Sequence, residues 1–352
     1  MPWGNSLPKS KEVSVWGVRR TRNRPAEDVI AEAVIAQRKL RLKEYKKYRS
    51  VAEIRADFID PAKAYFSLAA MTRRKLVEDE HRQIGMNQLF TFRSLLERQI
   101  FRQLEKNVDE LDLLRFASAN AFFGCSIKQG VSVRYPLLTC APTNKCGQGC
   151  YAHDGRDRAL IQVFRGSLNY LLGSTYENGN SKERSDIRLK MQGALDFAVC
   201  EAEGDAARAQ AEGFKRSPRI RLSHVGEMAA TPEFTNMLAE EIKRRNRKIQ
   251  CVIYTRHPSA EMFNRDLLVV NFTVEGANDP RWNYVKKGMR VVSSAWNGEI
   301  VENASVNFLE HHVEKSHEAS GMGNICPVTI DHKTFPSCDS AKCIRCFKNT
   351  DA

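Results

Sequence analysis

The feature that constrains this chain most is the alternation of strand-like and helical segments between residues 131 and 294. Segments of strand composition occur, in chain order, at Val131–Thr139, Arg219–Ser223, Ile249–Tyr254, Leu267–Val274 and Met289–Ser294. Segments of helical periodicity lie between several of them, at Asp157–Leu172 and from Pro232 to Arg247. Thr231, just before the second segment, is a residue type typical of an N-cap. Strands that alternate with helices predict a parallel sheet. We therefore expect an α/β fold built on a partial or full β/α barrel of the TIM type.

Composition divides the chain into four parts. Residues 1–25 combine proline, glycine and basic residues with little apolar periodicity, which predicts a flexible basic arm. In residues 26–125 apolar residues recur at helical spacing, and Asn87–Lys106 should form one long amphipathic helix. The barrel is expected over residues 126–310, with Gly173–Gly213 as a helical insertion or cover, and residues 311–352 form a Cys-rich C-terminal segment.

The charge of the chain is strongly positive and unevenly spread. The net charge is +13, and the first 50 residues hold 13 Lys or Arg against five acidic residues. A basic arm suits a polyanion, because neutralising phosphates releases bound counterions. Nucleic acid is therefore the expected partner, with single strands favoured. The alternative is a solvated tail that only aids solubility.

No segment has the composition of a membrane span or of a secretory signal. A bilayer is crossed by roughly 20 consecutive apolar residues, and no such run occurs in the chain. The start of the chain also lacks the apolar core of a signal peptide. We expect a cytoplasmic protein without a membrane partner, in which cysteines serve as metal ligands or packing residues rather than disulfides.

The first cysteine cluster places Cys140, Cys146 and Cys150 on one loop, with five and then three residues between them. Two glycines between the last two cysteines make this loop pliable, because glycine allows the backbone to approach closely. Three nearby thiolates can hold a polynuclear centre and leave one coordination position open or filled from elsewhere. The pattern predicts a [4Fe–4S] cluster. The alternative is a structural zinc loop completed by His153 or by a distant cysteine.

The second cysteine cluster provides four sulfurs, at Cys326, Cys338, Cys343 and Cys346. Four thiolates suit either a structural zinc ion or a second [4Fe–4S] cluster, and the spacing does not separate the two. We expect a metal here and leave its identity open. Three cysteines remain outside both clusters and are expected to be packing residues: Cys125, Cys200 and Cys251.

Polar residues follow two of the predicted strands, at the end where a β/α barrel gathers its chemistry. His224 can move protons near neutral pH, and Glu227 can act as a base or bind an amine or a metal. Tyr254 and Arg256 end the next predicted strand, and the planar guanidinium of Arg256 suits a phosphate or a carboxylate. We expect these four residues to line an active site. The alternative is a hydrogen-bonded loop without chemistry.

Several of these motifs together resemble a known family. The cysteine loop followed by Tyr-Ala, the run Arg-Leu-Ser-His-Val-Gly-Glu at Arg221–Glu227, the run Ile-Tyr-Thr-Arg at Ile253–Arg256, and the Cys-Pro…Cys…Cys-x-x-Cys tail are similar to the phage "gene product eighty-eight" family. This family occurs on phages and plasmids and looks distantly related to radical S-adenosylmethionine (SAM) enzymes. The resemblance covers about residues 130–347.

The resemblance implies a cofactor and a location. It implies that Cys140, Cys146 and Cys150 hold a [4Fe–4S] cluster, and that Gly226 and Glu227 bind the amino group of SAM. It also implies the cytoplasm of a bacterial host cell. The gaps of five and three residues between the cysteines differ from the three and two of radical SAM enzymes, so SAM enters as an alternative cofactor and not as a required one.

Two functions of different classes follow from these features. The first is an iron–sulfur enzyme that acts on nucleic acid, by cleavage of single-stranded DNA or RNA or by radical-SAM-type modification. The second is a nucleic-acid-binding or regulatory module whose metals only stabilise the fold. The chain carries neither a Gly-x-x-x-x-Gly-Lys-Ser/Thr phosphate loop nor a Gly-x-Ser-x-Gly elbow, which argues against a P-loop NTPase and a serine hydrolase.

Overall fold

The computed structural model describes a defined part of the chain, which divides into two compact units. The described residues are 13–15, 18–20, 51–76, 82–107, 122–126, 130–143, 146, 150–153, 155–214, 216–295 and 300–309. The first unit comprises Met1–Val108 and Cys146–Phe164, and the second comprises Asp109–Lys145 and Arg165–Ala352. Most of the predicted basic arm and all of the Cys-rich segment 311–352 lie outside the described residues.

The described residues of the first unit are mainly helical. Its helices are α2 (Val51–Asp57), α3 (Ile59–Leu76) and α4 (Arg82–Asn107), and α2 and α3 both pack against α4. The long helix predicted at Asn87–Lys106 is confirmed as part of α4. One side of α4 is buried because apolar residues recur every three or four positions, at Leu89, Phe92, Leu96, Ile100 and Leu104.

Short elements complete the first unit. Within the arm predicted to be irregular, β1 (Val13–Val15) and β2 (Val18–Arg20) pair as antiparallel strands, in keeping with the high strand propensity of valine. The 3₁₀ helices η2 (Tyr151–His153) and η3 (Gly155–Arg158) follow the cysteine loop.

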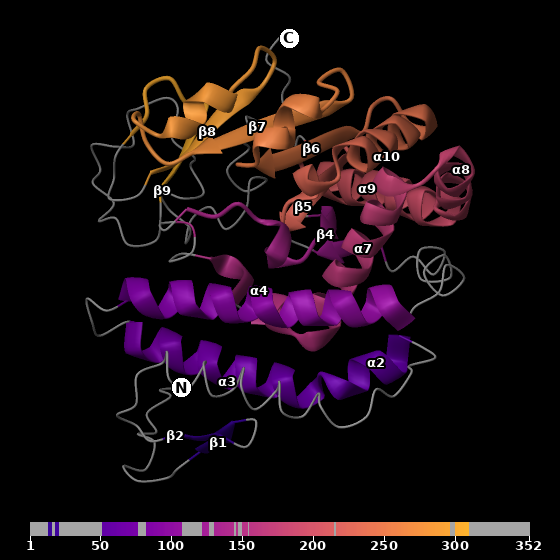
Figure 1. Cartoon of the computed structure of the whole chain (residues 1–352). Coiled ribbons are helices and arrows are strands. Elements are labelled where there is room, and N and C mark those ends of the chain that lie inside the picture. Colours follow the sequence, from indigo (N-terminus) through magenta and orange to yellow (C-terminus); the bar gives the residue numbers. More distant parts are fainter. Residues whose placement is uncertain are drawn as a thin grey trace. The chain divides into compact units, whose positions relative to one another are not determined.

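The second unit contains a seven-stranded sheet whose strands follow one another in chain order (Figure 1). The strands are β3 (Phe123–Ser126), β4 (Gly130–Arg134), β5 (Arg219–Val225), β6 (Gln250–Thr255), β7 (Leu268–Val274), β8 (Arg290–Ala295) and β9 (Val306–Leu309). All neighbours from β4 to β9 are parallel, and β3 joins β4 as an antiparallel edge strand. The predicted α/β class and parallel sheet are confirmed.

The sheet differs from the prediction in the end of one strand and in two strands that were not predicted. The strand expected at Val131–Thr139 ends at Arg134 because Pro136 follows, and a 3₁₀ helix, η1 (Leu137–Thr139), takes its place. β3 begins inside the region predicted to be helical, and β9 was not predicted. β9 is only four residues long, too short for a clear pattern in the sequence.

Helices fill the early connections and short 3₁₀ turns fill the later ones. Between β4 and β5 lie α7 (Leu160–Asn178), α8 (Ser181–Lys190) and α9 (Gln192–Ala211). The helical insertion predicted at Gly173–Gly213 is therefore this connection, and α9 packs against β3, β4 and β5. Between β5 and β6 lie η4 (Met228–Ala230) and α10 (Pro232–Arg245). The connection from β6 to β7 contains η5 (Pro258–Met262), and the connection from β7 to β8 contains η6 (Pro280–Tyr284). In the described part of the chain no helix is both long enough and apolar enough to span a membrane.

Thr231 occupies the predicted N-cap position of α10, but its side chain does not cap the helix. Its hydroxyl lies 2.8 Å from the Tyr135 hydroxyl, inside the core. The Phe234 N–H in the first turn of α10 donates instead to Glu177 Oε1 at 3.0 Å. A carboxylate from α7 thus satisfies a backbone donor that the sequence assigned to Thr231.

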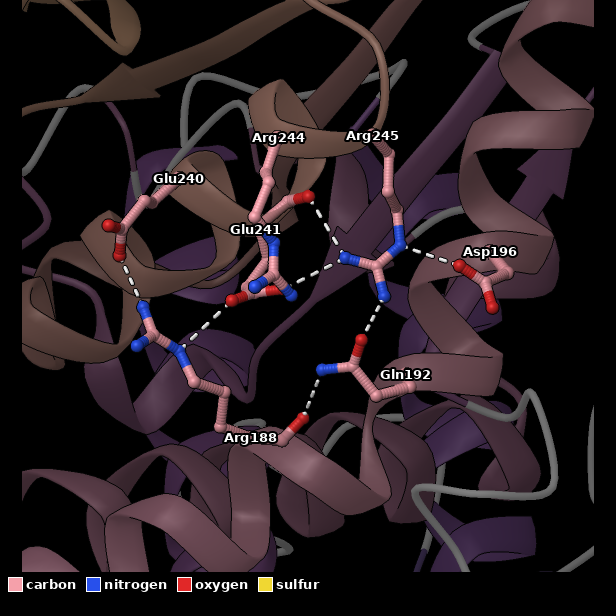
Figure 2. A network of polar contacts seen from close by, with 7 residues as sticks. All are labelled: Arg188, Gln192, Asp196, Glu240, Glu241, Arg244 and Arg245. Atoms are coloured by element: carbon pink, nitrogen blue, oxygen red, sulfur yellow. Dashed lines mark hydrogen bonds and ion pairs between the residues drawn. The ribbon is translucent and has the colours of Figure 1, made fainter.

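A network of charged residues joins α8, α9 and α10 around Glu241 (Figure 2). Glu241 is only 1% exposed, and its carboxylate pairs with three arginines: Arg188, Arg244 and Arg245. Arg245 reaches on to Asp196 at 2.6 Å. Burial tends to raise the Glu241 pKa, but the hydrogen bond from Arg245 and the neighbouring arginine charges outweigh it, so the pKa is lowered.

The two faces of the sheet differ in polarity. Strand residues alternate between faces, and the register aligns them across neighbouring strands. One face carries apolar residues that are completely buried: Ile220, Leu222, Ile253, Val270 and Phe272. The opposite, polar face carries Arg219, Arg221, Tyr254, Asn271, Thr273 and Arg290, beside the completely buried Val252 and Val292.

Candidate active site at the carboxyl ends of the strands

Hydrogen bonds connect the segments that follow β4, β5 and β6, and the centre of this arrangement is Glu227. The Glu227 N–H donates to Thr139 Oγ1 at 2.8 Å, which ties the β5 end to the β4 end. Glu227 Oε1 accepts the N–H of Arg256, just past β6, at 3.2 Å. The segments that follow three parallel strands thus meet at one residue, Glu227.

The Glu227 carboxyl group is electrostatically unusual. The residue is 8% exposed, and Oε2 has no hydrogen-bond partner among the described residues. Burial raises its pKa to about 7, against the opposing effects of the Thr255 hydroxyl, the Arg256 N–H and the charges of Arg256 and Arg281. A carboxyl group that titrates near neutral pH can both take up and release a proton, as a general acid or base must.

Gly226 has a structural reason to be glycine. Its φ is +74°, and a Cβ at this position would lie 2.5 Å from the carbonyl carbon and oxygen of Tyr135. The Gly226 carbonyl also accepts a hydrogen bond from Ser223 Oγ at 2.8 Å. This glycine lets the backbone pass closely over the β4 end and so places Glu227.

Arg256 lies at the same edge but is occupied by an acidic partner. Its Nη1 is 2.8 Å from Glu275 Oε1, just past β7, and its Nη2 donates to Ser294 Oγ of β8 at 3.2 Å. Both charged side chains are largely buried, at 15% and 13% exposed. The predicted anion-binding residue is therefore placed at the site, with its charge balanced by Glu275.

Tyr254 lies on the polar face of the sheet and supports another residue, Arg221 of β5. The Arg221 guanidinium lies 4.8 Å from the centre of the Tyr254 ring, in a cation–π contact. Phe308 approaches the same ring, with centroids 6.3 Å apart. Arg221 was not among the predicted site residues, although an arginine between Ile220 and Leu222 in a predicted strand is a usable signal.

His224 was expected in a loop but belongs to β5, which continues to Val225. It is 6% exposed, and alternation places it on the apolar face, with Ile220 and Leu222, away from Arg221 and Ser223. The difference arises because the strand is two residues longer than its apolar pattern suggested. Of the four predicted active-site residues, the described hydrogen bonds connect Glu227 and Arg256 directly.

The three cysteines predicted to form the first cluster are assigned to different units. Cys140 belongs to the second unit, whereas Cys146 and Cys150 belong to the first. The N–H of Cys140 donates to the Leu137 carbonyl at 3.0 Å, and the next residue, Ala141, accepts from Arg281 at 3.4 Å. Within the described ranges, no group of three or more His, Cys, Asp or Glu side chains is placed to hold a metal ion.

The surroundings of Cys150 in the first unit test how well this loop suits a metal centre. Cys150 is buried, and its pKa is raised to about 12 by burial and by Cys146, against the positive charge of Arg93. Arg93 is 2% exposed and pairs with Glu97 at 2.5 Å, while its Nη1 has no hydrogen-bond partner in the part of the chain described. A buried cation with an unused donor next to a thiol fits a bound thiolate, because coordination to a metal deprotonates the sulfur.

His153, the predicted alternative zinc ligand, is also placed in the first unit. It is completely buried, its N–H donates to the Cys150 carbonyl at 3.3 Å, and the Tyr65 hydroxyl lies 2.5 Å from its Nδ1. Tyr65 in turn lies under the Arg93 guanidinium, 5.1 Å from it. One ring nitrogen of His153 is therefore engaged by Tyr65, which leaves Nε2 as its nitrogen for a metal.

The three cysteines predicted to be packing residues differ in burial. Cys251 is buried in β6 as predicted, whereas Cys125 and Cys200 are exposed, so the expectation that all three are buried packing residues is wrong for two of them. The four predicted ligands Cys326, Cys338, Cys343 and Cys346 lie outside the described residues.

Comparisons with family models, with curated proteins and with solved structures find no match to this chain. The resemblance to the phage "gene product eighty-eight" family therefore stays a prediction from the motifs.

Proposed function

We propose that this protein is an enzyme that acts on nucleic acid and uses Glu227 as its acid–base group. The observation that carries the proposal is the buried Glu227 carboxyl, whose pKa lies at about 7 and whose Oε2 has no partner among the described residues. An unsatisfied buried carboxylate costs free energy, and such groups are more common at functional sites than elsewhere. Its position at the carboxyl ends of parallel strands supports the same reading.

The finer architecture is part of the proposal. Six parallel strands that pair in chain order are typical of a β/α barrel. The described strands end at two edges, β3 and β9, so the form that we propose is a partial barrel.

The cofactor we propose is a [4Fe–4S] cluster held by Cys140, Cys146 and Cys150. Such a cluster would supply an open iron or an electron to chemistry at the strand ends. The support is the donor set of three thiols on one loop and the buried Arg93 beside Cys150. SAM remains the alternative second cofactor, and the C-terminal cysteines remain the proposed site of a second cluster or of zinc.

The proposal is tested by metal analysis followed by oligonucleotide assays. Protein purified without oxygen should contain iron and acid-labile sulfide. Labelled single-stranded DNA and RNA are then incubated with and without SAM and a reductant. Nicking without SAM supports cleavage, and SAM-dependent product supports modification.

Glu227→Gln should lower the rate of either reaction by at least about a hundredfold, as expected for loss of an acid–base group. Glu212→Gln is a matched control, because it removes the same charge from an exposed position at the end of α9. A folded Glu227→Gln variant with unchanged activity would refute the assignment of Glu227.

The second candidate function is a nucleic-acid-binding module whose metals stabilise the fold. The charge balance of Arg256 by Glu275 favours it, because that pair connects β6 to β7 as a structural contact would. Zinc without sulfide, together with oligonucleotide binding and no product, would decide for this function.

A further inference from the structure

All charged residues of the six parallel strands are arginines. They are Arg134 in β4, Arg219 and Arg221 in β5, and Arg290 in β8. The pairing registers, together with alternation along each strand, place all four on the polar face of the sheet. These strands contribute no aspartate or glutamate to either face. A sheet face with one sign of charge attracts ligands of the opposite sign.

Arg221 is the arginine of this face whose surroundings are best defined. Its Nε donates to the Ser223 carbonyl at 2.8 Å, and its guanidinium stacks over the Tyr254 ring. Both partners are uncharged, and no carboxylate in the described part of the chain pairs with it. The side chain is therefore held in place while its positive charge stays unbalanced.

Arg221 and Arg256 differ in how readily each can bind an anion. Arg256 is held by Glu275, so an anion that bound it would compete with a carboxylate at 2.8 Å. Among the described residues Arg221 has no such competitor, and its two terminal amino groups have no hydrogen-bond partner there. A guanidinium in this state can bind two oxygens of a phosphate together. The hydrogen bond to Ser223 and the cation–π contact with Tyr254 hold the side chain in place in advance, which reduces the entropy lost on binding.

We propose that Arg221, oriented by Tyr254, binds a backbone phosphate of a single-stranded nucleic acid on the polar face of the sheet. This inference rests on the proposed function and names the part of the substrate that the site recognises. A backbone phosphate is chosen over a free carboxylate because the charged residues of these strands are all arginines and a nucleic-acid backbone presents a repeated anion. Glu227, two residues past β5, then lies beyond the same strand that carries Arg221.

The test is binding of a fluorescein-labelled 20-nucleotide single-stranded DNA to the full-length protein over a range of salt concentrations, followed by anisotropy. Loss of one phosphate contact lowers the slope of log K against log salt by about 0.7 for a single strand. Arg221→Gln should show this change and bind roughly tenfold more weakly at low salt, because a charge-assisted hydrogen bond is lost. Arg247→Gln removes the same charge from an exposed position past α10 and should change neither value.

Two substitutions of Tyr254 test whether its ring orients Arg221, and one substitution of Arg221 tests whether the guanidinium is needed beyond its charge. Tyr254→Phe keeps the ring and should bind as the wild type does, whereas Tyr254→Leu removes the stacking partner and should weaken binding in the same direction as Arg221→Gln. Arg221→Lys keeps the charge without the planar fork and should fall between the wild type and Arg221→Gln. Thermal unfolding of each variant confirms that it is folded.

The outcomes distinguish this inference from the proposed function. If the wild type binds the oligonucleotide and folded Arg221→Gln keeps the same affinity and the same salt slope, the inference is overturned and the proposed function stands. If the wild type binds neither single-stranded DNA nor single-stranded RNA at any salt concentration, both are overturned.

Discussion

Glu227 Oε1 accepts the backbone N–H of Arg256 at 3.2 Å, whereas its second oxygen is buried without a described partner. The half-satisfied carboxyl group joins the ends of β5 and β6 and remains available for a proton. This relationship underlies the first prediction.

The stability of the protein should fall as the pH rises through the range in which Glu227 ionises. The folded-state pKa of about 7 lies above the ordinary pKa of a glutamate, 4.5, so the folded state binds the proton more tightly than the unfolded state does. The resulting stabilisation is full below pH 4.5 and is lost as the pH rises to 7 and above. A shift of this size corresponds to about 3 kcal/mol.

Urea unfolding at pH 5 and pH 8 measures the effect. Glu227→Gln should lose less stability between the two pH values than the wild type does, by about 3 kcal/mol, whereas Glu212→Gln should behave as the wild type. An identical pH response in Glu227→Gln and the wild type would contradict the assignment of a raised pKa.

Gly226→Ala should destabilise the fold more than a substitution at another glycine of positive φ. A Cβ at Gly226 meets the Tyr135 backbone at 2.5 Å, whereas a Cβ at Gly213, where φ is +83°, has nothing within 4 Å. Gly213→Ala should cost about 1 kcal/mol from backbone conformation alone, and Gly226→Ala at least about 3 kcal/mol. Chemical denaturation compares the two, and equal costs would show that the close approach to Tyr135 relaxes freely.

Glu241→Ala should remove the central carboxylate of the charge network between α8, α9 and α10 and leave the outer pairs Arg188–Glu240 and Arg245–Asp196 (Figure 2). Removal of this buried carboxylate costs about 3 kcal/mol, because three arginines lose a shared partner. Glu240→Ala is the neighbouring control, since the Glu240 side chain is 59% exposed, and its loss should cost under about 1 kcal/mol.

The stability that Glu241 contributes should depend on pH with the opposite sign to the stability that Glu227 contributes. The Glu241 pKa is lowered in the folded state, so its stabilisation is present above the unfolded-state value and is lost as the pH falls through the folded-state value. Glu241→Gln should therefore flatten the acid limb of the stability curve. Urea unfolding across the acid range compares Glu241→Gln with the wild type.

Cys150→Ser should lower the content of iron and acid-labile sulfide in protein purified without oxygen. Cys200→Ser is the matched control, because Cys200 is an exposed cysteine of α9 that we assign to no metal. Metal and sulfide analysis of both variants gives the readout independently of activity. A normal iron and sulfide content in Cys150→Ser would remove this residue from the proposed ligands.

The strands could be predicted from sequence where apolar residues run without interruption. β6 and β7 were located to within a residue because their side chains are buried on both faces or nearly so. β9 escaped prediction because four residues carry too little pattern. The cap of α10 was assigned wrongly because a local rule favoured Thr231, while the actual acceptor, Glu177, lies in a helix far away in sequence.

In the candidate site too, contacts between residues far apart in sequence could be predicted only in part. The sequence places Glu227 and Arg256 at strand ends, and their contact in the structure is the one that parallel pairing leads us to expect. It does not show that Glu275 balances the charge of Arg256 or that Tyr254 supports Arg221. Both relationships depend on which face of the sheet each residue shares with its neighbours, and that depends on strand register.

The order of the strands has a consequence for how the sheet assembles. β6 to β9 follow one another with short connections, whereas β4 and β5 are separated by residues 135–218. The entropy cost of closing a loop rises with its length, and pairings of long sequence separation slow folding. The C-terminal strands should therefore form a nucleus first, and β4, with the first residues of the cysteine loop, should dock onto it late.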